Sequence, residues 1–338
     1  MSWVSSGGTR AKKVLIDPAG KEYFFKCSEK KPPKNGNPEK HYKYEFWNEI
    51  IAYQLGRQLG LNMLRYDLAI YKNEIGCISP NMIDLSSEQL IEVGRLMTAI
   101  NPKFTPETNE ARKQYTFQLL IDTISKFDLL KYLGHFLQII LFDSIISNRD
   151  RHQENWAFIS NTGMVKHISK SLKIENENEV SELLIKIIGN MVNPSEKSHN
   201  LSILKSALNI NQFAPIYDSG SSLGRELLDD RIDLLLENEK KINEYIDKGK
   251  SEVHWNNVKI SHFDLIDNLL KSPLKDVLID SSQFLKNWDS IDLDAIFDSI
   301  SKSIPNEWRH YDFPSNRRRF IIKLLTLRFE RIKSILSV

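Results

Sequence analysis

The sequence has few cysteines, no long apolar run and little net charge. Only Cys27 and Cys77 occur among its 338 residues, and they are too far apart to suggest a metal-ligand pair. Free thiols in a reducing compartment are therefore expected. No apolar run reaches the roughly 18 residues needed to cross a bilayer, and the opening MSWVSSGGTRAKK lacks the apolar core of a signal peptide. We expect a cytoplasmic protein, and non-classical export into a host stays open.

The charge balance argues against a protein that binds nucleic acid through bulk electrostatics. Lys and Arg together number 46 and Asp and Glu 44, which leaves a net charge of +2. A hydrophobic content of 41% with 27% charged residues is typical of a globular protein. A chain of this length can bury a large core or divide into two or three domains.

The first part of the chain is predicted to be rich in strands. Residues 5–9, Ser-Ser-Gly-Gly-Thr, can expose several backbone amides, as a loop that holds phosphates must. Strands are predicted at 12–16 and 22–27, joined by a turn at 17–20 that contains Pro and Gly. Lys26, near the end of the second strand, has the position of a lysine that contacts nucleotide phosphates. An exposed lysine on an edge strand is the alternative.

A helix is predicted at 44–60, because apolar residues recur there at steps of three and four. Glu45 and Glu49 lie four residues apart and share one face of this helix. Either could pair with Lys26, as a glutamate does in kinases. For Glu45 we expect an exposed charge instead.

An extended connector is predicted after this helix. Strands at 65–71 and 75–79 lead into the apolar stretch 77–83, which Pro80 interrupts. This stretch is predicted to join a small strand-rich part to a mainly helical remainder.

The remainder of the chain is predicted to be mostly helical. Helices are predicted from residues 86–88 onward, at 107–126, at 127–147 and at 314–336, a strand pair at 156–159 and 164–167, and an insertion at 168–212 with a helix at 180–191. The last helix has an apolar stripe that we expect in the core and an arginine-rich face that we expect to be solvated.

Two polar segments carry the candidate chemistry. In the segment 142–158, FDSIISNRDRHQENWAF, Asp150 is followed five residues later by Asn155. This is the catalytic-loop spacing of protein kinases, in which the Asp takes the substrate proton and the Asn holds magnesium. Further on, the apolar stretch before Asp218 delivers this residue into a Gly/Ser turn, as a second metal-binding Asp requires. A turn capped by the Asp is the alternative interpretation.

The order of these segments resembles the HipA-like serine/threonine kinases over most of the chain. The resemblance rests on the segments SSGGTRAKK, YFFKCS, FWNEIIAYQLGRQLGLN, FDSIISNRDRHQENWAF and APIYDSGSSLG. The family's catalytic loop reads Asp-x-His-x-x-Asn, which Asp150, His152 and Asn155 match. Its metal motif has Tyr-Asp before small residues, as Tyr217 and Asp218 do here. The resemblance implies an α+β, bilobal protein-kinase-like fold, with an N-lobe at 1–83 and a helical C-lobe at 84–338.

The resemblance also implies how ATP is bound. Ser6, Gly7 and Gly8 would belong to the phosphate loop. Lys26 would hold the phosphates and would be oriented by Glu49, which takes the position of the family's glutamate instead of Glu45. A serine of this loop can be autophosphorylated in the family, which makes Ser5 and Ser6 the candidates.

The remaining roles follow from the same resemblance. Pro80 and Met82, in the connector, would lie against the adenine. Asn155 and Asp218 would bind Mg²⁺, and Asp150 would take the proton of the acceptor hydroxyl. The histidine of the catalytic loop, His152, would brace that loop by hydrogen bonds.

Two departures from the family pattern affect the predicted partners and substrate. The extra N-terminal subdomain of full-length HipA toxins has no counterpart before the phosphate loop, so the chain looks more like split toxins and bacterial proteins that act on host cells. A protein substrate and an antitoxin or host-protein partner are therefore expected. Arg151 replaces a Gly that is common in the family motif, and Asp-Arg-His-x-x-Asn is also the motif of phosphoinositide kinases.

Three functions follow from these observations. The first is a protein serine/threonine kinase, and the second is a lipid kinase of the phosphoinositide type. The third is a non-catalytic binding module, either a pseudokinase or a toxin component, although Lys26, Asp150, Asn155 and Asp218 are all present. A metal-dependent hydrolase is disfavoured, because the sequence has no other His/Asp cluster with ligand spacing.

Overall fold

The structure is a computed structural model. It describes residues 12–28, 30–31, 40–101, 104, 113–161 and 208–337. The predicted phosphate loop at 5–9, the strand at 164–167 and the helix at 180–191 lie outside the described residues.

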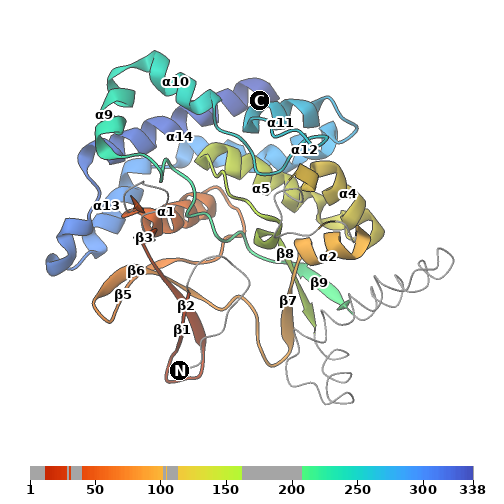
Figure 1. Ribbon diagram of the computed structural model, residues 1–338, viewed down its shortest axis with the longest axis horizontal. Helices are drawn as coiled ribbons and strands as arrows, with labels where there is room; N and C mark the ends of the chain where they lie inside the picture. The colour runs from red at the N-terminus through yellow and green to blue at the C-terminus, as the bar shows by residue number, and fades with distance from the viewer. Residues whose placement is uncertain are drawn as a thin grey trace.

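The first part of the chain forms a four-stranded antiparallel sheet (Figure 1). Its strands are β1 (Lys13–Ile16), β2 (Glu22–Cys27), β5 (Asp67–Tyr71) and β6 (Glu74–Pro80), in the order β1-β2-β6-β5. All four strands confirm the sequence prediction. Lys26 lies on β2, which has a neighbour on both sides, so the alternative of an edge-strand lysine is wrong.

Helix α1 (Glu45–Gln58) packs against this sheet and confirms the helix predicted at 44–60. Phe46 and Ile50 are among its buried apolar residues. The expectation of an exposed Glu45 is wrong, because this side chain is buried and forms an ion pair with Arg225. The Glu45 carboxylate therefore links α1 to the segment that follows Asp218, a candidate metal ligand.

A second antiparallel sheet has the order β7-β8-β9. It consists of β7 (Glu88–Glu92), β8 (Ala157–Asn161) and β9 (Ile210–Phe213). The helix predicted from residues 86–88 onward is wrong at its start, since residues 88–92 form β7 and helix α2 (Val93–Ile100) begins only afterwards. The alternating burial of β7 matches a strand that pairs with the buried β8.

The second half of the fold is mainly helical, as predicted. Helix α5 (Leu133–Ile146) is apolar on nearly all sides and buried on nearly all sides, which makes it the central helix of this region. Figure 1 shows it among α11, α12 and α14, all of which contact it. The remaining elements are β3 (Lys30–Lys31), β4 (Lys40–His41), α4 (Phe117–Lys126), η1 (Leu130–Tyr132), η2 (Gln153–Asn155), α9 (Asp229–Glu237), α10 (Glu239–Asp247), α11 (His262–Leu270), α12 (Lys275–Ser281), η3 (Ser282–Ser290), α13 (Leu293–Ser303), η4 (Asn306–Tyr311) and α14 (Ser315–Leu336).

The arginines of α14 do not all lie on a solvated face, so this expectation is wrong for Arg317 and Arg328, which are buried. Arg328 donates hydrogen bonds to Ser144 O and Ile246 O, in the last turns of α5 and α10. Its positive charge thus meets the negative ends of two helix dipoles. Burial lowers the pKa of Arg328 to about 9, which still leaves the guanidinium protonated at neutral pH.

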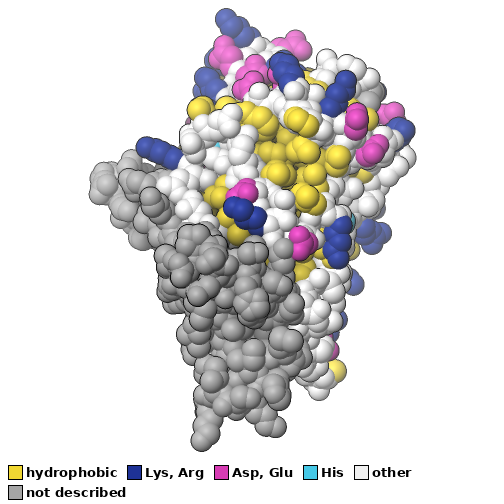
Figure 2. Space-filling model, turned by 90° about the vertical axis from the view of Figure 1, so that its right-hand side faces the viewer, with side chains coloured by type: hydrophobic (Ala, Val, Ile, Leu, Met, Phe, Trp, Pro, Cys, Tyr) yellow, Lys and Arg dark blue, Asp and Glu magenta, His cyan; other side chains and the backbone are white. Residues whose placement is uncertain are grey.

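The side of the molecule that carries α4, α11 and α12 is shown in Figure 2. Hydrophobic side chains gather near the centre of its described part, with charges of both signs interspersed around them. The described side chains of this face therefore offer no continuous basic surface for a nucleic acid.

None of the helices in the described part of the chain is long and apolar enough to span a membrane.

The position of Arg328 generates a stability prediction. Arg328→Ala leaves two buried carbonyls without their charged donor, and we expect a loss of at least about 3 kcal/mol in the free energy of unfolding. Arg331→Ala is the matched control on the same helix, because this arginine forms a half-exposed ion pair with Asp247, and it should cost less than about 1 kcal/mol. Urea unfolding of both variants measures the difference. Equal losses would contradict the role assigned to Arg328.

Candidate active site

Three elements that are distant in the sequence meet at the ammonium group of Lys26. Lys26 Nζ on β2 lies 3.0 Å from Glu49 Oε1 on α1. It also lies 2.8 Å from Asp218 Oδ1, in the segment after β9. The structure thus joins the predicted lysine, its predicted glutamate partner and the predicted metal-binding aspartate in one cluster.

Burial and charge act in opposite directions within this cluster. Burial acts to lower the pKa of Lys26, but Asp218 and Glu49 outweigh it and raise the pKa well above its ordinary value. Burial raises the pKa of Glu49, while the Lys26 ammonium opposes that rise. Both carboxylate oxygens of Glu49 accept hydrogen bonds, one from Lys26 Nζ and the other from Ser219 N. These contacts favour a charged lysine between two carboxylates.

Backbone contacts hold the segment around Asp218 against α1. Ser219 N donates to Glu49 Oε2 at 2.8 Å, and Asn48 Nδ2 donates to Ser222 O at 2.7 Å. Asp218 itself has a left-handed backbone, with φ of 56°. A Cβ atom at Gly220 would lie 3.2 Å from Glu49 Oε1, a tight contact that would force the Glu49 carboxylate to shift by a few tenths of an ångström.

The carboxylate of Asp150, in the candidate catalytic loop, accepts contacts from both sides. His152 Nε2 lies 2.7 Å from Asp150 Oδ1, and Ser221 Oγ donates to Asp150 Oδ2 at 3.0 Å. The hydrogen bond to Asp150 is the largest influence on His152 and raises its pKa, against the effect of burial. His152 thus contacts the candidate base directly, in agreement with the bracing role that the resemblance implies.

Asn155 lies in η2 and is nearly buried. Its Nδ2 donates to Asp150 O at 3.2 Å, which leaves its side-chain oxygen available to other groups. Together with the Asp218 carboxylate it offers two oxygen ligands of the kind that Mg²⁺ prefers. Among the described residues no three His, Cys, Asp or Glu side chains gather to hold a metal alone. This donor set fits a magnesium ion that also binds phosphate and water.

Arg151 is a structural residue of the loop. It is buried, and its Nε and Nη2 atoms each lie 2.8 Å from the Asp143 carboxylate at the end of α5. Its Nη1 donates to Tyr217 O, the residue before Asp218. Burial acts to lower the pKa of Arg151, but Asp143 raises it overall. Because the guanidinium joins the two candidate segments in the interior, it is not available to contact an acceptor.

Two further residues at the cluster were not singled out from the sequence. Burial and the charge of Lys26 lower the pKa of Lys12, whereas Asp218 and Glu49 act to raise it. Lys12 is therefore a second lysine that interacts electrostatically with the cluster. Tyr66 Oη accepts a hydrogen bond from Asp218 N at 3.3 Å, and Lys26 Nζ lies 5.6 Å from the centre of its ring. Lys12 lies within the segment SSGGTRAKK, which could have drawn attention to it, whereas no sequence motif marked Tyr66.

The residues predicted to contact the nucleotide are only partly placed. Ser5, Ser6, Gly7 and Gly8 lie outside the described residues. Pro80 is the last residue of β6, on the sheet that carries Lys26, and both Pro80 and Met82 are half-buried. Their contact with adenine stays a prediction.

The contact between His152 and Asp150 generates a prediction for titration. Because its pKa is raised in the folded state, protonated His152 stabilises the protein fully below the unfolded pKa of about 6.5. This contribution is lost as the pH rises through the raised pKa. NMR titration should give a pKa for His152 above about 6.5 in the wild type and a lower value in Asp150→Asn. His152→Gln identifies the resonance, and an unchanged pKa in Asp150→Asn would refute the contact.

Comparisons with known proteins agree with this arrangement at the level of the fold. No protein-family model matches the sequence, and no curated protein matches it either. The crystal structure of the proinflammatory kinase CtkA of Helicobacter pylori is similar, with a TM-score of 0.64 and 18% identity over 98% of this chain and 92% of that chain. HipA of Shewanella oneidensis MR-1, in its complex with HipB and operator DNA, has a TM-score of 0.49 and 12% identity over 99% of this chain and 67% of that chain.

The kinase-like α+β fold that the resemblance to HipA-like kinases implies is therefore confirmed, and over nearly its whole length the chain has the fold of the kinase CtkA.

Proposed function

We propose that the protein is an ATP- and Mg²⁺-dependent protein serine/threonine kinase. The observation that carries the proposal is the contact of Lys26 with both Glu49 and Asp218, in a chain with a kinase fold. In protein kinases this lysine–glutamate pair and this aspartate must both be in place for phosphoryl transfer. The predicted division into an N-lobe at 1–83 and a C-lobe at 84–338 would place ATP between the lobes.

The cluster is suited to bind a polyphosphate. Lys26 is held by two carboxylates, and the partly buried Lys12 lies within its field. Phosphate oxygens would give both ammonium groups an additional partner and relieve the repulsion between them. Asn155 and Asp218 would hold Mg²⁺, which would supply neutralisation of the phosphate charge.

Asp150 is the proposed base. The acceptor hydroxyl takes the place of Ser221 Oγ at Asp150 Oδ2, the only position at which a hydroxyl already contacts this carboxylate among the described residues. Its oxygen forms a bond to the γ-phosphorus as the bond from that phosphorus to the bridging oxygen breaks. Asp150 accepts the proton and ADP leaves with the electron pair of the broken bond. His152 keeps the carboxylate oriented during this exchange.

A protein acceptor is favoured over a lipid. Arg151 was the residue that suggested a phosphoinositide kinase, and its burial against Asp143 removes it from the acceptor side. Autophosphorylation is part of the proposal, with Ser5 and Ser6 of the predicted phosphate loop as the candidate sites. A phosphate there would compete with the nucleotide phosphates for the same backbone amides and for Lys26. The complex of HipA with HipB suggests an antitoxin-like partner, and a host protein is the other proposed partner.

One assay tests the proposed activity. Wild type and Asp150→Asn are incubated with labelled Mg-ATP and either bacterial lysate, lipid vesicles or no addition. Loss of the base should lower transfer about 10²- to 10⁴-fold, and chelation of magnesium should abolish it. Mass spectrometry then locates phosphate on the protein itself, with Ser5 and Ser6 as the expected sites.

Each arm has its own contrary outcome. Transfer to vesicles but not to protein would favour the lipid kinase. No transfer to any acceptor by the wild type would support the non-catalytic binding module. An active enzyme without phosphate on Ser5, Ser6 or Thr9 would refute only the autophosphorylation.

A further inference from the structure

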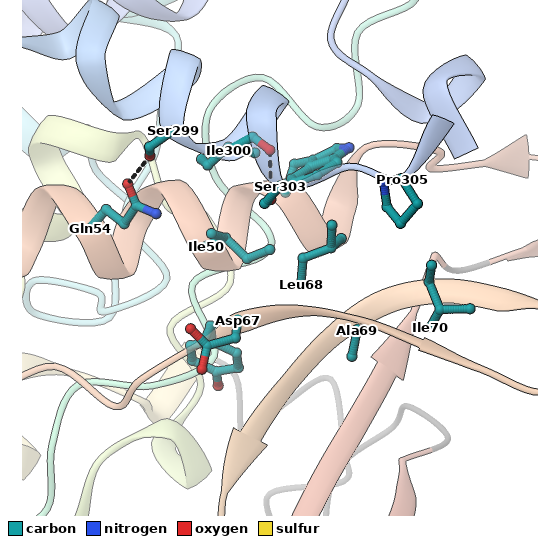
Figure 3. A pocket seen from close by; sticks show the side chains of 12 residues that line it. Ile50, Gln54, Asp67, Leu68, Ala69, Ile70, Ser299, Ile300, Ser303 and Pro305 are labelled. Carbon is teal, nitrogen blue, oxygen red and sulfur yellow. Dashed lines mark hydrogen bonds between the residues drawn. The ribbon is translucent and has the colours of Figure 1, made fainter. Parts of the chain in front are cut away.

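A cavity of about 400 Å³ lies between α1, β5 and α13 (Figure 3). It is bounded by α1, by β5, and by the end of α13 with the residues that follow it. Its apolar walls include Trp47, Ile50, Leu68 and Ile300. At one side Ser299 Oγ donates a hydrogen bond to Gln54 Oε1, which closes the cavity between α13 and α1.

The strand that borders this cavity has a free edge. Within the described part of the chain, β5 is the outer strand of its sheet and pairs only with β6. A two-residue turn, Lys72-Asn73, joins the two strands, and both residues have positive φ values of 48° and 59°. The residues that flank such a turn, Tyr71 and Glu74, form a hydrogen-bonded pair.

The register then fixes which backbone groups point outward. Hydrogen-bonded pairs alternate along the ladder, so Tyr71, Ala69 and Asp67 direct their backbone groups toward β6. Leu68 and Ile70 direct their N–H and C=O groups toward the free edge. The side chains of the same two residues line the cavity, and Ile70 is 40% exposed although it is apolar.

We propose that this edge and cavity bind an extended peptide segment of a partner protein, with a bulky apolar side chain of the peptide in the cavity. A peptide residue opposite Leu68 or Ile70 pairs with their free backbone groups and directs its side chain to the same face of the sheet. That face is the one on which the apolar walls lie. Within the described residues, the unpaired edge of β5 and the partly apolar cavity beside it together favour an extended peptide as the occupant.

The site is in contact with the candidate catalytic cluster through two elements. Trp47 and Ile50 line the cavity from α1 and flank Glu49, which holds Lys26. Tyr66 also lines the cavity, and its Oη accepts the hydrogen bond from Asp218 N. A bound peptide would therefore restrain the residues that position Lys26 and Asp218. This consequence rests on the proposed function, whereas peptide binding does not.

The test uses the full chain and a phage-displayed library of random linear heptapeptides. The wild type should enrich peptides that contain a bulky apolar residue between residues of high strand propensity, without proline at the pairing positions. Ser303→Arg places a long charged side chain at the cavity from an exposed position of α13. It should lower recovery of these peptides by at least about tenfold. Ala295→Arg, at an exposed position of the same helix that does not line the cavity, is the matched control.

A second measurement locates the peptide without relying on the variants. Hydrogen exchange of the wild type with a selected synthetic peptide should slow at the amides of Leu68 and Ile70, because both become paired. Three results would overturn the proposal: no enrichment by the wild type, enrichment that Ser303→Arg leaves unchanged, or exchange at Leu68 and Ile70 that the peptide does not slow. None of these readouts depends on kinase activity.

Discussion

The ammonium group of Lys26 is the point on which the candidate site depends. It lies between the carboxylates of Glu49 and Asp218, so that β2, α1 and the segment after β9 must approach one another for the contact to form. Two carboxylates that close together in a buried site repel each other, and the charged lysine makes their approach favourable. The same geometry leaves a positive group beside two acidic ones, and we propose that phosphates and a magnesium ion complete this arrangement.

A second buried ion pair, between Arg151 and Asp143, likewise connects distant segments of the site. Arg151 binds Asp143 at the end of α5 and also Tyr217 O, just before Asp218. The central helix, the candidate catalytic loop and the candidate metal-binding segment are thereby connected through one guanidinium. Separating Arg151 from Asp143 would leave a buried charge without a partner, which is strongly destabilising. The pair therefore holds the loop in one position. Its role explains why an arginine next to Asp150 need not indicate a lipid acceptor.

Local patterns in the sequence predicted much of the fold and the members of the site. The four strands of the first sheet, α1 and α14 were accessible from periodicity and turns, whereas the pairing of Lys26 with Glu49 and the role of Asp218 were implied by the resemblance to HipA-like kinases. The errors concern residues whose environment is created by distant segments. Residues 88–92 form a strand because β8, far along the chain, pairs with them, and Glu45 and Arg328 are buried by partners from remote elements. Tyr66 was missed for the same reason, since no motif surrounds it. Ser221 lies within the segment APIYDSGSSLG, but its contact with Asp150 depends on the distant catalytic-loop segment.

The central claim is that Glu49 serves the nucleotide site through Lys26, and a pair of isosteric variants tests it directly. Glu49→Gln removes the charge that orients Lys26, whereas Glu45→Gln changes a buried glutamate one turn away that pairs with Arg225 instead. Calorimetric titration with Mg-ATP should show an affinity at least about tenfold weaker for Glu49→Gln, a loss of roughly 1.4 kcal/mol in binding free energy, and an affinity close to that of the wild type for Glu45→Gln. Equal affinities of the wild type and Glu49→Gln, or no binding of Mg-ATP by the wild type, would contradict the account.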